Sequence, residues 1–175
     1  MLIRTVLGGL LILFTSGCMV QAAPSAAVLP FEMQIDLQMD GLDLYGLPPK
    51  PKKAEVERLK LVRQSMLELL KERGAYEIVD LAAHQSEIRK AAPFDRCNGC
   101  EVEFGKLVNA DVTILGVVHK SSELLINMAI FVRDVKSGEI KQTALASILQ
   151  NDDTGWLKAI RSLVNSRLAP EVEPK

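Results

Sequence analysis

The chain has 175 residues, of which 48% are apolar and 25% are charged. This length predicts a single domain with a sizeable core, and the apolar fraction excludes a disordered chain. Its 21 basic and 22 acidic residues give a net charge of −1, so the sequence has no electrostatic footprint for nucleic acid.

The first residues have the layout of a secretory signal. Arg4 supplies a positive charge, and the apolar run from Val6 to Phe14 is too short to span a bilayer with margin. Ala22 ends a stretch with the small-residue pattern that signal peptidase cuts. This pattern predicts a signal peptide over residues 1–22 and a mature chain that begins at Ala23.

A second ending of the signal is open. Residues 15–18 read Thr-Ser-Gly-Cys and resemble a bacterial lipobox, which would make Cys18 a lipidated N-terminus. Met19 after this cysteine favours the outer membrane over the inner one. Both endings predict export, either as a soluble periplasmic protein or as an outer-membrane lipoprotein that faces the periplasm.

The first mature segment predicts a strand, a connection and a long helix. Residues 26–33 form the strand, with Pro30 at an edge or a strand end because proline cannot donate to a ladder. Residues 34–53 form a polar connection whose length is typical of functional loops. Residues 54–73 form the helix, and Gly74 suits a left-handed cap. The apolar residues of this helix recur every three or four positions: Val56, Leu59, Val62, Met66, Leu67 and Leu70.

Shorter elements make up the middle of the chain. Residues 76–81 predict a second strand, and residues 82–92 predict a weak helix that ends at Pro93. Residues 101–109 predict a short helix. The β-branched run over residues 112–118 is typical of a strand that is buried on both faces.

The last part of the chain predicts a hairpin and a helix. Strands over residues 124–134 and 140–150 are joined by a turn at 136–139. Residues 151–154 offer N-cap side chains for a helix that runs to about residue 168, and residues 169–175 form a loose tail. The residues of this helix that we expect to face inward are Trp156, Ile160, Leu163, Val164 and Leu168.

This order of elements predicts the fold class. Strands that alternate with helices in the first half indicate parallel pairing, and the tight turn later indicates antiparallel pairing. We therefore expect one α/β domain over residues 23–168. It is a two- or three-layer sandwich with a mixed sheet of about five strands flanked by helices.

Cys97 and Cys100 are the most distinctive local feature. In an oxidising compartment, this even pair favours a structural disulfide. A redox-active pair is an alternative, because a helix that starts near Cys100 would stabilise a thiolate. Zinc binding together with His84 and His119 is a second alternative. Haem attachment is excluded because Glu101 stands where histidine is required.

Motifs of catalysis and nucleotide binding are missing from the sequence. The acidic residues Asp36, Asp40 and Asp43 lack the spacing of a calcium loop. The paired carboxylates Glu101 and Glu103, like Asp152 and Asp153, are explained as helix starts. We therefore predict no catalytic residue, no cofactor site and no metal site, and we expect the protein not to be an enzyme.

A series of short motifs carries a family resemblance. Residues 27–32 (Ala-Val-Leu-Pro-Phe-Glu), the long helix before Gly74, residues 76–80 and residues 109–116 follow one another along the chain. The series resembles the α/β domain shared by the curli-secretion lipoprotein and the N-terminal domain of the Tol-system propeller protein. The chain is more similar to a family of secreted bacterial proteins of unknown function. The resemblance implies an adaptor-type α/β module, without a pore and without a propeller.

Export, the missing motifs and this resemblance suggest a function. The first hypothesis is a non-catalytic periplasmic domain that binds or assists another cell-envelope protein. Its candidate surfaces are the 34–53 connection and the region of Cys97 and Cys100. The alternatives are a thiol–disulfide or dehydrogenase-accessory redox protein that uses these cysteines, and a carrier of a small ligand.

Overall fold

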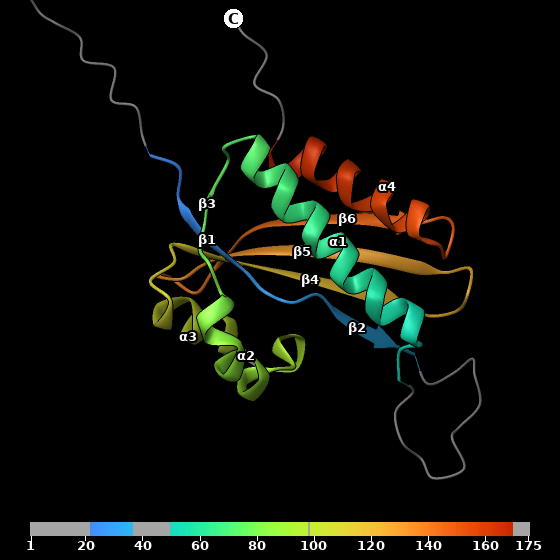
Figure 1. Cartoon of the computed structure of the whole chain (residues 1–175), viewed down its shortest axis with the longest axis horizontal. Helices are drawn as coiled ribbons and strands as arrows, with labels where there is room; N and C mark the ends of the chain where they lie inside the picture. Colours follow the sequence, from blue (N-terminus) through green and yellow to red (C-terminus); the bar gives the residue numbers. More distant parts are fainter. Residues whose placement is uncertain (1–21, 37–49, 98, 170–175) are drawn as a thin grey trace, which may run out of the picture.

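The computed structural model describes residues 22–36, 50–97 and 99–169. The predicted signal peptide with Cys18, most of the 34–53 connection and the tail from residue 170 lie outside these ranges. Within them, a mixed sheet is flanked by helices (Figure 1), which confirms the predicted α/β class. None of the helices in the described ranges is long and apolar enough to cross a membrane.

The sheet has six strands in the order β3-β1-β4-β5-β6, and β2 pairs with β4 beyond the end of β1. The first three strands all run parallel to their neighbours, whereas β5 is antiparallel to both β4 and β6. Their bounds are Ser25–Val28 (β1), Glu32–Ile35 (β2), Glu77–Ile78 (β3), Val112–Lys120 (β4), Ile126–Asp134 (β5) and Ile140–Ile148 (β6).

The strand predicted over residues 26–33 is wrong as a single element. It is broken into β1 and β2, which pair with the first and second halves of β4. Pro30 lies at the break, which confirms the predicted strand end. Phe31 lies there too, and a Cβ atom on Gly116 of β4 would overlap its ring. Gly116 thus makes room for the ring at the break.

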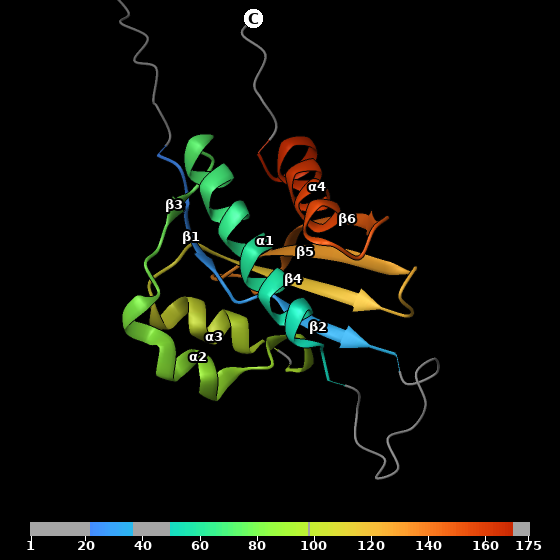
Figure 2. The same ribbon diagram turned by 45° about the vertical axis from the view of Figure 1, so that its right-hand side comes forward.

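Two helices cover one face of the sheet. Helix α1 (Lys53–Glu72) and helix α4 (Asp153–Leu163) lie side by side (Figures 1 and 2), and a π-helical turn (Val164–Leu168) continues α4. Asp152 caps α4, because its carboxylate accepts from the Gly155 backbone N–H at 2.7 Å. The inward residues predicted for this last helix are all buried, as is Ala169 beyond it, so the predicted loose tail does not begin at that residue.

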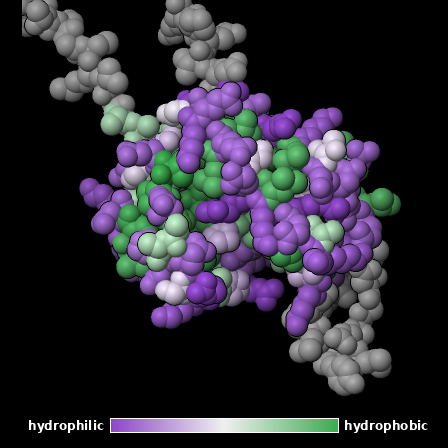
Figure 3. Space-filling model, viewed as in Figure 1, coloured by the Kyte–Doolittle hydropathy of each residue, from purple (hydrophilic) through white to green (hydrophobic). Residues whose placement is uncertain are grey.

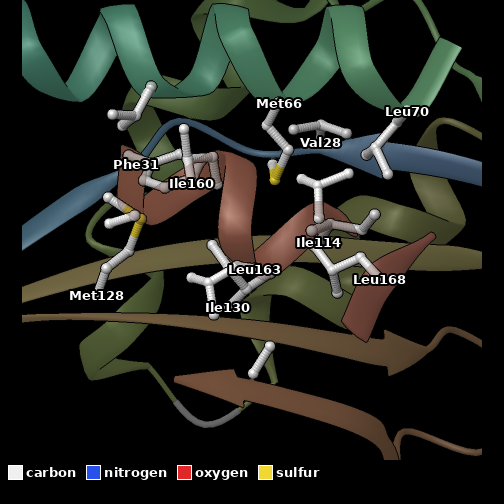
Figure 4. Close-up of a cluster of buried hydrophobic side chains, with 14 of the residues drawn as sticks. Val28, Phe31, Met66, Leu70, Ile114, Met128, Ile130, Ile160, Leu163 and Leu168 are labelled. Carbon is white, nitrogen blue, oxygen red and sulfur yellow. The ribbon is translucent and has the colours of Figure 1, made fainter. Parts of the chain in front are cut away.

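The main core lies between these two helices and the sheet. Met66 and Leu70 of α1 face Ile114 of β4 and Ile130 of β5 (Figure 4), and all four side chains are fully buried. The predicted stripe of α1 is wrong at its start, because Val56 is 37% exposed and Glu55 is buried in its place. Hydrophilic side chains cover most of the outer surface on this side of the molecule (Figure 3).

Glu55 is buried because it forms an ion pair. Lys120, at the end of β4, places its Nζ atom 2.8 Å from Glu55 Oε1 and 2.6 Å from Glu123 Oε1. Lys52 and Asn151 also contact Glu123. Because of the hydrogen bonds from Lys120, Lys52 and Asn151, the pKa of Glu123 is lowered to about 2. This network joins the end of β4 to the starts of α1 and α4.

The opposite face of the sheet is covered only in part. Helices α2 (Gln85–Ala91) and α3 (Cys100–Leu107) pack below β1 and the first half of β4 (Figure 2), with 3₁₀ turns at Ala82–His84 (η1) and Phe94–Arg96 (η2). The predicted strand over 76–81 is reduced to β3, which has two residues. The sandwich therefore has three layers on the β1 side and two layers on the β5–β6 side.

Candidate functional site

The uncovered part of the sheet forms a groove. Its floor is the lower face of β4, β5 and β6, and its wall is made by η2 and the start of α3. The cavity volume is about 640 Å³. We call this cavity the open-face groove.

The floor of the open-face groove is largely apolar. Successive side chains of a strand point to opposite faces, so every second residue of β4 and of β5 points into the groove. Leu115 and Val117 of β4 are buried, and Ala129 and Phe131 of β5 are half-buried. Leu145 of β6, at the outer rim, is 71% exposed. The floor thus presents apolar surface to solvent beside the buried core.

Strand β2 holds the wall of the groove in place. The Glu32 carboxylate accepts from the backbone N–H groups of Phe94 and Asp95, each at 2.8 Å. The Gln34 amide donates to Asp95 Oδ2 at 2.7 Å. Burial raises the pKa of Glu32, and the two backbone N–H groups oppose that shift. The side chains of one short strand therefore position η2 over the sheet.

The predicted cysteine pair forms the next part of the wall. Cys97 and Cys100 are joined by a disulfide, with their Cα atoms 5.8 Å apart. Gly99 precedes α3 with a φ of 97°, a conformation that favours glycine. Cys100 is the first residue of α3, and its backbone N–H donates to Cys97 Sγ at 3.2 Å. The pair thus connects η2 to α3 at the rim of the groove.

Three polar residues define one end of the groove. Glu101 of α3 is 6% exposed, and its Oε1 atom lies 2.8 Å from Nε of Arg133 on β5. Thr113 of β4, which is 1% exposed, lies directly opposite Arg133 in the β4–β5 register. Glu101, which the sequence explained as a helix-start carboxylate, is therefore a buried lining residue of the groove. Glu103 is exposed and pairs with Lys106, as a helix-start carboxylate does.

His119 and Asp36 lie near the other end. His119 Nε2 is 2.8 Å from Asp36 Oδ1, and Ser121 donates to Asp36 Oδ2 at 2.6 Å. The hydrogen bonds from Ser121 and His119 lower the pKa of Asp36. His84 instead lies edge-on to Phe104 of α3.

The zinc alternative is not formed by the described residues. Cys97 and Cys100 are joined to each other, and within the described ranges no cluster of three or more His, Cys, Asp or Glu side chains is arranged to hold a metal ion. Asp40 and Asp43 lie outside those ranges.

The sequence pointed to only part of this site. Gln34 and Cys97, which belong to the two surfaces selected from the sequence, both line the groove. Thr113, Phe131, Arg133 and Leu145 were missed. Residues 128–132 read Met-Ala-Ile-Phe-Val, and such an apolar run is typical of a strand buried on both faces, so this segment gave no signal that one of its faces lies against solvent.

One family model matches residues 24–168, which is most of the chain. The chain belongs to the DUF3280 family. This family is described as "Protein of unknown function (DUF2380)", which agrees with the resemblance to proteins of unknown function. No curated protein matches this DUF3280 sequence.

Solved structures share the fold of this DUF3280 chain at low sequence identity. Lipoprotein GNA1162 from Neisseria meningitidis has a TM-score of 0.53 at 15% identity, over 81% of this chain and 93% of that chain. The LpoB C-terminal domain from Salmonella enterica has a TM-score of 0.51 at 12% identity, over 76% of this chain and 87% of that chain. Both likenesses establish the fold alone.

The likeness expected to the Tol-system propeller protein is weak. TolB from Acinetobacter baumannii has a TM-score of 0.39 at 12% identity. The match covers 82% of this chain and 29% of that chain.

Proposed function

We propose that this protein is an exported, non-catalytic domain that binds another protein of the cell envelope through the open-face groove. One observation carries the proposal: the groove leaves an apolar floor uncovered on a sheet whose other face packs against α1 and α4. Exposed apolar surface next to polar residues is typical of interaction sites.

The shape of the groove favours a protein segment over an enclosed small ligand. Small-molecule sites bury about 70–90% of their ligand. Here Leu145 is 71% exposed and Ile140 is 47% exposed, so one side of the groove stays open along β6. An extended segment fits such a site, because its outer side chains remain in water.

The proposed location depends on the predicted signal. Residues 1–22 direct export in this proposal, with the lipid anchor at Cys18 as the alternative ending. The disulfide between Cys97 and Cys100 supports the same location, because disulfides persist in oxidising compartments. We therefore place the domain in the periplasm.

Photo-crosslinking in cells that export the full chain tests this function. A photoreactive residue replaces Leu145 in the groove, and in a control it replaces Lys158, which is exposed on α4 on the other side of the sheet. We expect one discrete protein adduct from position 145 and none from position 158. Ala129→Gln, which fills the floor with a larger polar side chain, should remove the adduct. Equal adducts from both positions, no adduct at all, or an adduct that survives Ala129→Gln would refute the proposal.

One observation favours the redox alternative. Cys100 is the first residue of α3, where the backbone N–H groups and the helix dipole stabilise a thiolate. A protein that exchanges this disulfide requires a reduction potential appreciably less negative than about −300 mV. Titration of the pair with defined redox buffers therefore separates the two functions, and a potential below that value excludes the redox alternative.

A further inference from the structure

Strand β6 forms a long edge of the sheet. Within the described residues it pairs with β5 alone. Native proteins protect such an edge with proline, with charged side chains or by keeping the strand short. β6 has nine residues and no proline, and its one charged residue, Lys141, is bound to Asp134 at 2.7 Å. Residues 142–148 therefore lack the usual protection of an edge.

The hydrogen bonds at the end of β5 show which backbone groups of β6 bond to it. Lys120 and Ile126 lie opposite each other at the turn between β4 and β5. Just beyond them, the Ser121 N–H donates to the Leu125 carbonyl at 3.0 Å. A bond in this place means that the pair inside it is not hydrogen-bonded, because the two kinds of pair alternate in an antiparallel ladder. Ile126 therefore directs its backbone groups to the other side, towards Ile148 of β6.

The direction of these groups alternates along β6. Ala144 and Ala146 bond to β5 in the same way as the last residue of the strand. Thr143, Leu145 and Ser147 occupy the positions between, so the N–H and C=O groups of each point away from β5. No other described backbone group bonds to them. The edge thus presents a donor and an acceptor at every second residue.

The same three residues face the open-face groove. Leu145 and Ser147 line it, and Thr143 lies two positions before Leu145 and so on the same face of β6. Residues directly opposite each other in neighbouring antiparallel strands have their side chains on one face. A strand that pairs with this edge therefore places every second side chain over the floor of the groove.

We propose that an extended segment of the partner protein adds to β6 as an antiparallel strand, with an apolar side chain beside Leu145. This inference rests on the proposed function and specifies how the partner binds. Backbone hydrogen bonds hold such a segment, and the groove selects its alternate side chains. Leu145 is 71% exposed, and an apolar neighbour removes its surface from water. Residues 142–148 offer no counter-charge, so the segment is uncharged and has apolar residues at alternate positions.

A second copy of this chain fits the edge less well than a single segment. Helix α4 and the π-helical turn lie on β6 from the core side (Figure 1), where Gln142 donates to the Arg167 carbonyl. Two paired β6 strands would be about 4.8 Å apart. The α4 helices above them would have a similar spacing, whereas packed helices need about 8–10 Å between their axes. A segment without a helix of its own avoids this overlap.

Hydrogen exchange in the exported, processed protein tests the added strand. In the free protein, the amides of Thr143, Leu145 and Ser147 should exchange about tenfold faster or more than those of Ala144 and Ala146, which bond to β5. The probe is the peptide acetyl-Leu-Thr-Leu-Thr-Leu-amide, which is uncharged and alternates apolar with polar side chains. Bound in excess, it should slow exchange at the three edge amides.

Two methylated isomers of this peptide supply the matched control. A methyl group on the nitrogen of the central leucine removes a donor that faces β6, so this isomer should bind about tenfold more weakly or worse. A methyl group on the nitrogen of a threonine faces away from β6 and should leave binding unchanged. Equal binding of the two isomers, or no slowing of the edge amides by the parent peptide, overturns the added strand.

Proline at the edge tests the same contact in cells. Thr143→Pro removes an outward N–H and no bond to β5, a position at which an edge strand tolerates proline. Thr143→Val is the matched control, because it keeps the N–H. The crosslink from position 145 should be lost in Thr143→Pro and kept in Thr143→Val. If Thr143→Pro fails to fold, the comparison of the two methylated peptides decides.

The outcomes separate this inference from the proposed function. A crosslink that survives in folded Thr143→Pro overturns the added strand and leaves the protein-binding function standing. Absence of any crosslink from position 145 refutes the proposed function, whatever the peptides show. Edge amides that become slower as the protein alone is concentrated, with a crosslinked product of twice the chain mass, would assign the edge to a second copy and overturn the inference.

Discussion

The ring of Phe31 lies against Gly116, at the break between β1 and β2. Any side chain at position 116 would have to displace the ring or the strand. Gly116→Ala should therefore destabilise the protein by about 1–3 kcal/mol, as overpacking of a core does. Urea unfolding followed by circular dichroism measures the change.

A double variant separates this clash from a general loss of strand stability. Phe31→Leu removes the ring atoms that a Cβ on residue 116 would meet. In Phe31→Leu/Gly116→Ala, the two effects should be non-additive by about 0.5 kcal/mol or more. Strict additivity would mean that the ring and residue 116 do not interact.

Lys120→Met should be strongly destabilising. It leaves the buried Glu55 carboxylate without its cation, and breaking a buried pair typically costs about 3–5 kcal/mol. Glu55→Met/Lys120→Met should recover most of that loss, because no uncompensated charge stays buried. The exposed pair Lys60–Glu57 is the matched control: Lys60→Met should cost less than about 1 kcal/mol. Chemical denaturation of the four proteins gives the comparison, and similar losses for Lys120→Met and Lys60→Met would contradict it.

Acid should weaken the network at Glu123. The folded-state pKa of Glu123 is lowered from 4.5 to about 2 because Lys120, Lys52 and Asn151 bind the carboxylate. A lowered pKa adds stability that is present above pH 4.5 and is lost as the pH falls towards 2. The free energy of unfolding of Glu123→Gln should therefore fall less steeply than that of the native protein over this range, with a constant difference at neutral pH. Parallel curves throughout would show that the carboxylate is not bound in solution.

Glu32→Gln should loosen the wall of the groove without unfolding the domain. An amide can replace only one of the two acceptor oxygens that bind Phe94 and Asp95. Hydrogen exchange should speed up at these two amides by about tenfold, the equivalent of one weakened hydrogen bond. Glu77→Gln, on the exposed end strand β3, is the control and should leave their exchange unchanged.

The helices could be predicted from the sequence because their signals are local. The inward stripe of α4 and the cap at Asp152 depend only on residues within a few turns. The error at Glu55 has a different cause. Its burial depends on Lys120, which belongs to a strand far along the chain. The spacing of the apolar residues in α1 cannot indicate that contact.

The break between β1 and β2 and the composition of the groove were not predictable for the same reason. Phe31 meets Gly116 only after the parallel sheet has formed. Glu101, Thr113 and Arg133 each have an ordinary local explanation, as a helix start, a buried strand residue and a strand-end charge. They come together only in the folded protein, where the β4–β5 register places Thr113 opposite Arg133 and Arg133 pairs with Glu101. Cys97 and Cys100 could be selected because their spacing is itself the signal.

The disulfide between Cys97 and Cys100 closes a ring with only two residues between the cysteines. So small a ring restricts the unfolded chain by about 2 kcal/mol at most. Dithiothreitol or another thiol in a purification buffer that reduces this disulfide therefore removes the covalent link between η2 and α3. The midpoint of thermal unfolding should then fall by only a few degrees. A preparation handled in such buffers can keep a native-looking melting curve and still have lost the shape of the groove rim. The oxidation state of Cys97 and Cys100 therefore has to be checked before a negative result in a binding experiment is accepted.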